Sequence, residues 1–195
     1  MLELILSDES DTLKMGAAIM HAINKIESDE VEIHLSGNLG AGKTTLVRGI
    51  LQSTGWKGPV TSPSYTLCEE YEFDSQLFLH VDLYRISESE DVEILDLDRK
   101  ITKQKIIFIE WPENLLASRT SHLIIELIHL DHKRQVRVKS GITEIESLIK
   151  ELIAEKGWEP SIARVPGEDT ASLFTIRFLS EHIGAEQASA IMDLL

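Results

Sequence analysis

The chain has 195 residues, enough for one domain with a substantial hydrophobic core or for a compact domain with an appendage. Its 19 Lys and Arg against 33 Asp and Glu give a net charge of −14, which disfavours a protein that grips nucleic acid over a broad surface by itself. Hydrophobic residues make up 43% of the chain, a globular rather than a disordered composition.

Targeting and redox signals are weak in this sequence. No segment approaches the roughly 20 apolar residues that span a bilayer. The single Cys68 cannot form an internal disulfide. Residues 1–8 are acidic where a secretory signal would be basic. We therefore expect a cytoplasmic protein without membrane attachment.

The first elements alternate between strand and helix periods. Leu2–Leu6 is predicted as a strand, and Ser10–Ile26 as a helix because its apolar residues recur at helical spacing. Val31–Ser36 alternates apolar and polar residues, which indicates a strand, and it runs directly into glycines. Helical character returns over Thr44–Ser53. The polar residues that could cap the first helix are Ser7, Asp8, Ser10 and Asp11.

The middle of the chain combines a hairpin pattern with an acidic segment. Thr66–Tyr71 and Leu77–Val81 are predicted strands, and Phe73–Gln76 between them suits a turn. Residues 87–98 combine acidic and apolar side chains, which indicates one or two short amphipathic helices. Ile106–Ile109 is a continuous apolar run and predicts a strand buried on both faces.

The last third of the sequence predicts a hairpin and a helix, followed by a segment of different composition. His122–Leu130 and Gln135–Lys139 predict a second hairpin, and Ile142–Ile153 predicts a helix. Beyond it, glycines and prolines interrupt the chain, after which Ala171–Ile183 and Ala185–Leu195 suggest a helical hairpin. We therefore predict a nucleotide-type α/β domain over residues 1–156 and a helical C-terminal appendage over residues 157–195.

Residues 37–44 match the phosphate-binding loop pattern G-x-x-x-x-G-K-[ST] at every fixed position. Glycines let successive backbone N–H groups wrap the phosphates, and the following helix presents its positive N-terminus to them. Lys43 would reach the β- and γ-phosphates, and the Thr44 hydroxyl would ligate Mg²⁺. Because a predicted strand precedes the loop and a predicted helix follows it, the sequence predicts nucleotide binding.

Magnesium needs a second protein anchor, normally an acid at the end of a neighbouring buried strand. Glu110 follows Ile106–Ile109 directly, where a side chain faces the crevice at the carboxyl ends of the strands. The alternative is an exposed strand-end carboxylate without a role. Asp82 ends its own strand in the same manner, so it could bind Mg²⁺ through water or position an attacking water.

Four segments together resemble the signature blocks of the TsaE (YjeE) family. The blocks are Gly37–Thr45 with Arg48–Gly49, Thr61–Leu67, His80–Arg85 and Ile109–Glu113. They occur in the family's order and the resemblance covers about the first 150 residues, with Ser64 where threonine is common. It implies a P-loop NTPase fold: a three-layer α/β sandwich whose central sheet is mostly parallel, with antiparallel hairpins.

The resemblance also implies roles for individual residues. Lys43, Asp82 and Glu110 would be the catalytic residues, and Thr44 and Glu110 would hold Mg²⁺. Thr61, Ser62 and Thr66 would lie in a switch-like loop near the γ-phosphate. Contacts with ATP are expected from Thr12, Asn38, Leu39, Gly40, Ala41, Gly42, Lys43, Thr44, Thr45, Thr61, Asp82 and Trp111.

Members of this family are weak ATPases that serve the threonylcarbamoyladenosine modification of tRNA beside the anticodon. The resemblance implies partners of the TsaD and TsaB type, with tRNA held mainly by a partner. This chain would then reset or activate the assembly rather than transfer the threonylcarbamoyl group, and its acidity fits that role. The alternatives are a small-molecule or nucleotide kinase, which can use the same loop, and a nucleotide-gated scaffold.

Several residues keep more than one interpretation. Asp82 could form a structural pair with Arg85, and Trp111 could serve packing alone. The basic segment Asp131–Lys139 could be a solvated hairpin or could contact a nucleotide, a partner or tRNA. Residues 157–195 carry no catalytic signature, and their role is open, as are the oligomeric state and the preference for ATP over GTP.

Overall fold

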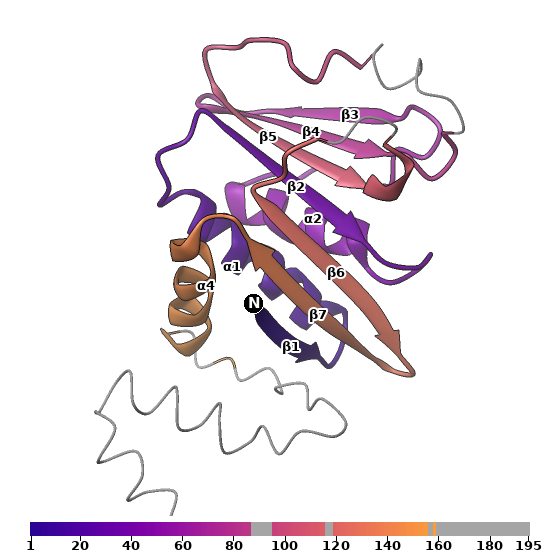
Figure 1. Ribbon diagram of the computed structural model, residues 1–195, viewed down its shortest axis with the longest axis vertical. Coiled ribbons are helices and arrows are strands. Elements are labelled where there is room, and N and C mark those ends of the chain that lie inside the picture. The colour runs from indigo at the N-terminus through magenta and orange to yellow at the C-terminus, as the bar shows by residue number, and fades with distance from the viewer. Residues whose placement is uncertain (87–94, 116–118, 156–157, 159–195) are drawn as a thin grey trace, which may run out of the picture. The chain divides into compact units, whose positions relative to one another are not determined.

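The computed structural model describes residues 1–86, 95–115, 119–155 and 158. Figure 1 shows a sheet with the strand order β1-β7-β6-β2-β5-β4-β3. The strands are β1 (Leu2–Leu6), β2 (Glu30–Ser36), β3 (Cys68–Glu72), β4 (Gln76–Asp82), β5 (Gln104–Glu110), β6 (Leu123–Leu130) and β7 (Lys133–Ser140). The helices are α1 (Glu9–Ile23), α2 (Lys43–Thr54), α4 (Thr143–Glu155) and the 3-10 turn η1 (Pro112–Asn114).

The centre of the sheet is parallel and its margins are antiparallel. β2 pairs in parallel with both β5 and β6, and β5 pairs in parallel with β4. The hairpins β3–β4 and β6–β7 and the pair β1–β7 are antiparallel. This arrangement confirms the predicted α/β fold with a mostly parallel centre and antiparallel hairpins.

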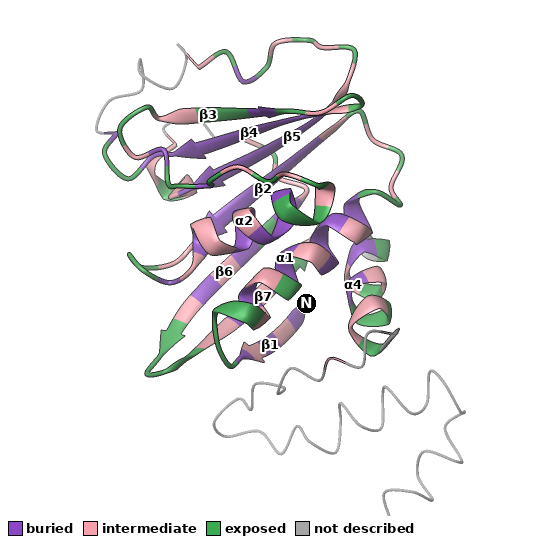
Figure 2. Cartoon of the chain, turned by 180° about the vertical axis from the view of Figure 1, so that it is seen from behind, coloured by how far each residue is buried: buried purple, intermediate pink, exposed green. Residues whose placement is uncertain are grey.

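The two faces of the sheet are covered differently. Val31, Ile33 and Leu35 of β2 point into a core shared with α1, α2 and α4, and these helices lie together on one face (Figure 2). On the other face, Ile107 and Ile109 of β5 pack with apolar residues of the neighbouring strand and of irregular segments. Polar side chains lie instead at the strand ends: Asp82 ends β4, Glu110 ends β5, and the glycine-containing loop follows β2.

Helices α1 and α2 approach each other closely through two glycines. A Cβ on Gly16 of α1 would lie 2.5 Å from the Leu46 carbonyl oxygen, and one on Gly49 of α2 would lie 2.4 Å from the Leu13 carbonyl oxygen. Any larger side chain would push the helices apart, since atoms cannot approach so closely. This contact fixes α2, and therefore the loop that precedes it, against α1.

The observed boundaries correct several details. The first helix ends at Ile23, three residues before the predicted end at Ile26, and Asp8 caps it by accepting a hydrogen bond from the Asp11 amide. Thr66 lies in a turn rather than in the predicted strand because Leu67 adopts a left-handed φ of 64° and its amide bonds to the Pro63 carbonyl. Residues 95–98, which end the segment predicted to form one or two short helices, lie in turns and irregular backbone.

The rest of the predicted acidic helices, residues 87–94, lies outside the described residues. So does the predicted appendage, with one exception: Trp158 donates a hydrogen bond from Nε1 to Oδ1 of Asp11, 3.0 Å away. Within the described part of the chain, no helix is long and apolar enough to cross a membrane.

Candidate functional site

The loop between β2 and α2 is built by glycines in left-handed conformations. Gly37 has φ 133° and Gly42 has φ 107°, and a Cβ on Gly37 would lie 2.2 Å from the Leu127 carbonyl oxygen. Glycine is therefore required at the first position by space and at both by conformation. The loop leads directly into helix α2, and no side chain caps the N-terminus of this helix. Unpaired amides at such an end suit an anion.

A cavity of about 490 Å³ opens over this loop. Its size suits a small-molecule ligand. It is lined by Leu39, Gly40, Ala41, Gly42, Lys43, Thr44, Thr45, Ser62, Ser64, Asp82, Tyr84, Arg85, Glu110, Trp111 and Arg134. Residues from four separate segments therefore converge on the predicted phosphate-binding loop.

Lys43 is buried at the start of α2 without a carboxylate in ion-pair contact among the described residues. Its Nζ donates to the carbonyl oxygens of Gly37 at 2.6 Å and Asn38 at 3.2 Å, and it lies 4.0 Å from the ring centre of Trp111. Burial lowers the pKa of Lys43, although the charges of Glu110 and nearby acids oppose that shift. An ammonium held in this way is ready to exchange carbonyl partners for phosphate oxygens.

Glu110 ends β5 beside the loop, as predicted. Its Oε1 accepts hydrogen bonds from the Thr44 hydroxyl at 2.8 Å and from Nε2 of His80 at 2.9 Å. A hydroxyl and a carboxylate are oxygen ligands that Mg²⁺ prefers, and the metal usually completes its shell with phosphate and water. The described residues contain no cluster of three or more His, Cys, Asp or Glu side chains that could hold a metal ion by themselves. Thr44 and Glu110 therefore fit Mg²⁺ that arrives with a nucleotide.

Asp82 ends β4 next to Glu110 in the sheet register. The Ser62 hydroxyl donates to its Oδ2, and the Tyr84 amide donates to its Oδ1 at 2.9 Å. Arg85 makes a different contact: its guanidinium lies 4.4 Å from the ring centre of Tyr65. The alternative of a structural Asp82–Arg85 pair is therefore wrong, because two other donors hold this carboxylate.

Trp111 follows Glu110 in a left-handed conformation, with φ 60°. The turn places its ring 5.0 Å from that of Tyr84 as well as over the Lys43 ammonium. Trp111 thus both packs and contacts a predicted site residue, so the two interpretations of its role are compatible.

Three residues predicted to contact ATP are not among those that line the cavity. Thr12 is buried in α1, and its hydroxyl donates to the Asp8 carbonyl at 3.1 Å. Asn38 contributes its carbonyl oxygen to Lys43. Thr61 is exposed, whereas its neighbour Ser62 lines the cavity. Their contacts with ATP remain predictions.

The structure brings residues to this site that the sequence analysis does not assign to it: Ser64, Tyr84, Arg85 and Arg134 line the cavity, and His80 contacts Glu110. His80 is buried and supports Glu110, and its position two residues before Asp82 on a strand was a usable signal, because alternate strand residues share a face. The sequence places Arg134 only within the basic segment Asp131–Lys139. No sequence pattern links it to the loop, where its Nε donates to the Ala41 carbonyl at 3.1 Å.

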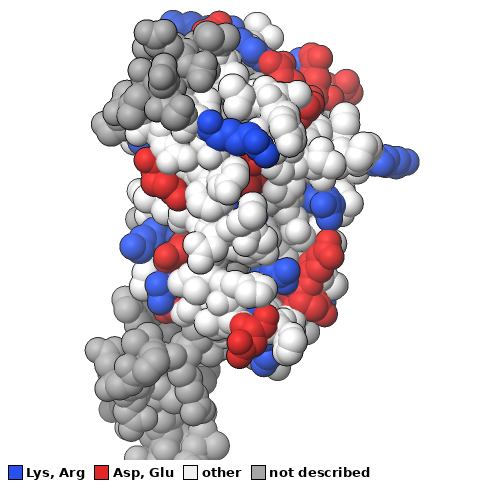
Figure 3. Space-filling view, turned by 90° about the vertical axis from the view of Figure 1, so that its right-hand side faces the viewer, with Lys and Arg blue, Asp and Glu red and all other residues white. Residues whose placement is uncertain are grey.

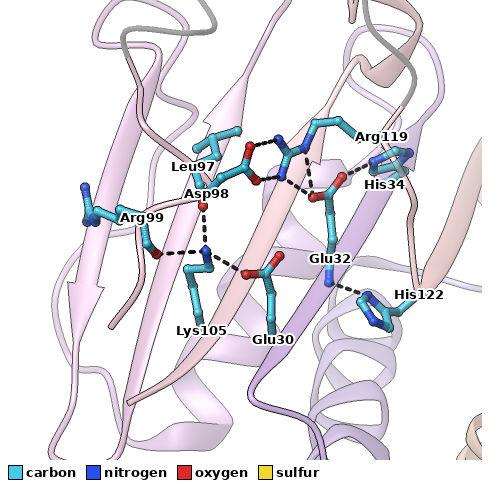
Figure 4. Close-up of polar contacts among 9 residues, drawn as sticks. All are labelled: Glu30, Glu32, His34, Leu97, Asp98, Arg99, Lys105, Arg119 and His122. Atoms are coloured by element: carbon cyan, nitrogen blue, oxygen red, sulfur yellow. Dashed lines mark hydrogen bonds and ion pairs between the residues drawn. The ribbon is translucent and has the colours of Figure 1, made fainter. Parts of the chain in front are cut away.

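A second polar cluster lies at the opposite, amino ends of the parallel strands (Figure 4). The Glu32 carboxylate accepts hydrogen bonds from Arg119 at 2.8 Å and His34 at 2.7 Å, and Arg119 also pairs with Asp98. Burial alone would raise the pKa of Glu32, but these hydrogen bonds and the charge of Arg119 outweigh it and leave the pKa lowered. Lys105 donates to the Leu97 carbonyl and pairs with Glu30 at 2.6 Å.

Figure 3 views the molecule from the side toward which the arrowheads of β2, β4 and β5 point in Figure 1. Basic side chains on this face are scattered among acidic and uncharged ones rather than joined in one patch. This distribution agrees with the net charge of −14. It gives no broad basic surface on the viewed face for nucleic acid.

Comparison with known proteins gives consistent matches. The family model described as "Threonylcarbamoyl adenosine biosynthesis protein TsaE" matches residues 6–138. A Haemophilus influenzae protein named tRNA threonylcarbamoyladenosine biosynthesis protein TsaE is 39% identical over 107 residues, covering 54% of this chain and 68% of the relative. A protein of the same name from Aquifex aeolicus is 36% identical over 139 residues, covering 70% and 94%. The crystal structure of Bacillus subtilis YdiB is similar, with a TM-score of 0.57, 25% identity and coverage of 80% and 95%.

Proposed function

This chain belongs to the TsaE family of threonylcarbamoyl adenosine biosynthesis proteins, and from that membership we propose that it is a Mg²⁺-dependent ATPase that serves the threonylcarbamoyladenosine modification of tRNA. The observation that carries the ATPase part is the contact between the Thr44 hydroxyl and Glu110. These residues are 66 positions apart in the chain, yet they meet beside Lys43 as Mg²⁺ coordination in a P-loop nucleotide site requires.

Each charged residue of the site has a defined task in this proposal. The Lys43 ammonium leaves its two backbone carbonyls and binds the β- and γ-phosphates. Thr44 and Glu110 hold Mg²⁺, which neutralises developing charge on the phosphates when bound. Asp82, held at both oxygens by Ser62 and the Tyr84 amide, accepts a hydrogen bond from the attacking water and orients it.

We further propose that ATP turnover resets or activates a complex with TsaD-type and TsaB-type proteins, which perform the transfer on tRNA. Two observations support this division of labour. The cavity over the loop offers phosphate-binding groups and metal ligands, whereas the viewed face around it carries no continuous basic surface for tRNA. Association with a partner would bring the tRNA without requiring this acidic chain to bind it directly.

The test measures phosphate release and tRNA modification together. Purified chain receives ATP with and without Mg²⁺, and with and without TsaD-type and TsaB-type proteins and substrate tRNA. We expect slow Mg²⁺-dependent release alone, and repeated modification cycles only when this chain and ATP are both present. Phosphate transfer to an added small-molecule acceptor would instead favour a kinase. Modification cycles that run equally well without this chain would contradict the proposed role.

A further inference from the structure

The described arginines divide into two groups. Four pair with carboxylates: Arg48 with Glu9, Arg99 with Glu70, Arg119 with Glu32 and Asp98, and Arg137 with Glu3 and Glu126. The other two, Arg85 and Arg134, have no carboxylate partner within the described ranges, and both line the cavity. In a chain of net charge −14, acids are plentiful, so unpaired arginines at one cavity indicate a ligand that supplies their partner.

The two arginines lie on different sides of the phosphate-binding loop. Strand β2, which leads into the loop, has β5 on one side and β6 on the other. The predicted metal and water residues, Glu110 and Asp82, end β5 and β4, and Arg85 follows Asp82. Arg134 instead lies at the start of β7, just after the hairpin that ends β6. The metal contacts the β- and γ-phosphates, so this end of a bound nucleotide would lie beside β5. The nucleoside at the other end of the phosphate chain would then lie on the opposite side of the loop, beside β6.

Contacts with the loop hold Arg134 in place. Its Nε donates to the Ala41 carbonyl at 3.1 Å. A Cβ on Gly42 would lie 3.0 Å from this Nε and 3.3 Å from Cδ, so the side chain lies directly on the glycine. The same Cβ on Gly42 would lie 3.7 Å from Cγ2 of Thr12 in α1. Within the described part of the chain, Nε is the only nitrogen of the Arg134 guanidinium that donates a hydrogen bond. The two outer nitrogens and the face of the guanidinium plane are therefore available to a ligand.

We propose that Arg134 forms the nucleoside subsite: its guanidinium, fixed to the loop through Ala41, packs against the purine and ribose of the bound nucleotide. A planar guanidinium binds an aromatic ring through stacking and cation–π attraction, which a lysine cannot reproduce. This subsite rests on the proposed function, because it assumes that the loop binds nucleotide phosphates. It also gives Arg134, alone among the residues of the basic segment Asp131–Lys139, a role in nucleotide binding.

The test separates the nucleoside from the phosphates. Binding of MgADP and of Mg²⁺ tripolyphosphate to the full chain is measured by calorimetry for wild type, Arg134→Met and Arg134→Lys. We expect Arg134→Met to weaken MgADP binding about tenfold and to change tripolyphosphate binding less than twofold. Arg134→Lys keeps the charge but lacks the planar group, so it should lose nearly as much MgADP affinity. Lys133→Met removes the same charge from the adjacent exposed position and serves as the matched control.

Each other result has a distinct meaning. Equal losses for both ligands would make Arg134 a phosphate contact and overturn the subsite. Unchanged MgADP affinity in Arg134→Met, or full recovery in Arg134→Lys, would overturn it as well. Melting temperatures of the variants, measured alongside, exclude unfolding as the cause of a loss. A wild-type chain that binds neither ligand would contradict the proposed function itself.

Discussion

Charged side chains of the same kinds are buried at both ends of the parallel strands, but they have different partners at the two ends. At the amino ends, Lys105 pairs with Glu30 at 2.6 Å, and Glu32 pairs with Arg119 at 2.8 Å. At the carboxyl ends, the Lys43 ammonium contacts backbone carbonyls and a tryptophan ring, and no carboxylate lies in ion-pair distance among the described residues. A buried charge without an opposite charge is costly.

This difference distinguishes a structural cluster from a binding site. The amino-end cluster is complete, because each of its charges has a partner within the chain (Figure 4). At the carboxyl-end site, no carboxylate of the described residues lies within ion-pair distance of Lys43 or of the two cavity arginines, Arg85 and Arg134. In the proposed function, a bound nucleotide with its Mg²⁺ would supply both the phosphate anions and a cation for Glu110. Matched substitutions at the two ends can test this division.

The largest expected effect separates the two buried lysines. Lys43 is 4% exposed and Lys105 is 3% exposed, so Lys→Met at either position removes one charge from a comparable environment. We expect Lys43→Met to weaken MgATP binding about 100-fold, because the hydrogen bonds from the ammonium to the phosphates are lost. Calorimetry measures the affinity, and denaturant unfolding should show stability near that of the wild type.

Lys105→Met is the matched control for this prediction. Its loss leaves the Glu30 carboxylate and the Leu97 carbonyl without their partner. We expect about 2 kcal/mol of lost stability and an unchanged nucleotide affinity. If Lys105→Met impaired nucleotide binding as much as Lys43→Met, the two ends would not be functionally distinct.

The buried glutamates give the next largest effect. Glu110→Gln keeps the shape of the side chain but removes the anionic oxygen that Mg²⁺ needs, so Mg²⁺ should no longer strengthen ATP binding. Affinity for ATP in the presence of EDTA should stay within about twofold, since Lys43 and the loop remain. Titrating Mg²⁺ into the chain with ATP measures the change. Retained Mg²⁺ dependence would remove Glu110 from the metal site.

Glu32→Gln should instead change stability and its dependence on pH. The folded-state pKa of Glu32 is lowered from its ordinary value of 4.5. The ionised carboxylate therefore stabilises the fold above that pH, and this contribution is lost as the pH falls through the lower folded-state pKa. We expect Glu32→Gln to cost about 2 kcal/mol at pH 7, and to flatten the decline in stability below about pH 4.5. Denaturant unfolding at several pH values measures both effects, with nucleotide affinity unchanged.

The sequence alone predicts that Lys43, Thr44 and Glu110 meet at the carboxyl ends of the strands, because local rules determine the position of each of them. The loop motif places Lys43 and Thr44 at the start of a helix, and a buried apolar run predicts that Glu110 ends a strand. Local pattern and position in the sheet agree at these residues. The same rules predicted the strands of the centre and both hairpins within a few residues.

The remaining contacts could not be predicted because they depend on strand order and on turns. The polar residues Glu32 and His34 alternate with apolar ones, yet they are buried because Arg119 and the segment around Asp98 cover them. Arg134 reaches Ala41 only because β6 lies beside β2. Thr66 lies outside the strand predicted for it because the strand begins only after Leu67, which adopts a left-handed conformation that leucine disfavours.

The smallest expected effect concerns two histidines that each contact a buried glutamate. His80 Nε2 lies 2.9 Å from Glu110, and His34 Nε2 lies 2.7 Å from Glu32. The other ring nitrogen of His80, Nδ1, is buried and has no hydrogen-bond partner among the described residues. The bond from Nε2 to Glu110 is therefore the one hydrogen bond that the His80 ring makes there.

We expect His80→Phe to weaken Mg²⁺ binding to the chain with ATP about tenfold, the usual effect of losing a group that orients a metal ligand. His80→Gln can still donate to Glu110 and should recover most of the loss, whereas a purely packing role would favour the phenylalanine. His34→Phe, the matched control, should leave Mg²⁺ binding unchanged, and an equal loss in both phenylalanine variants would show that the effect does not pass through Glu110.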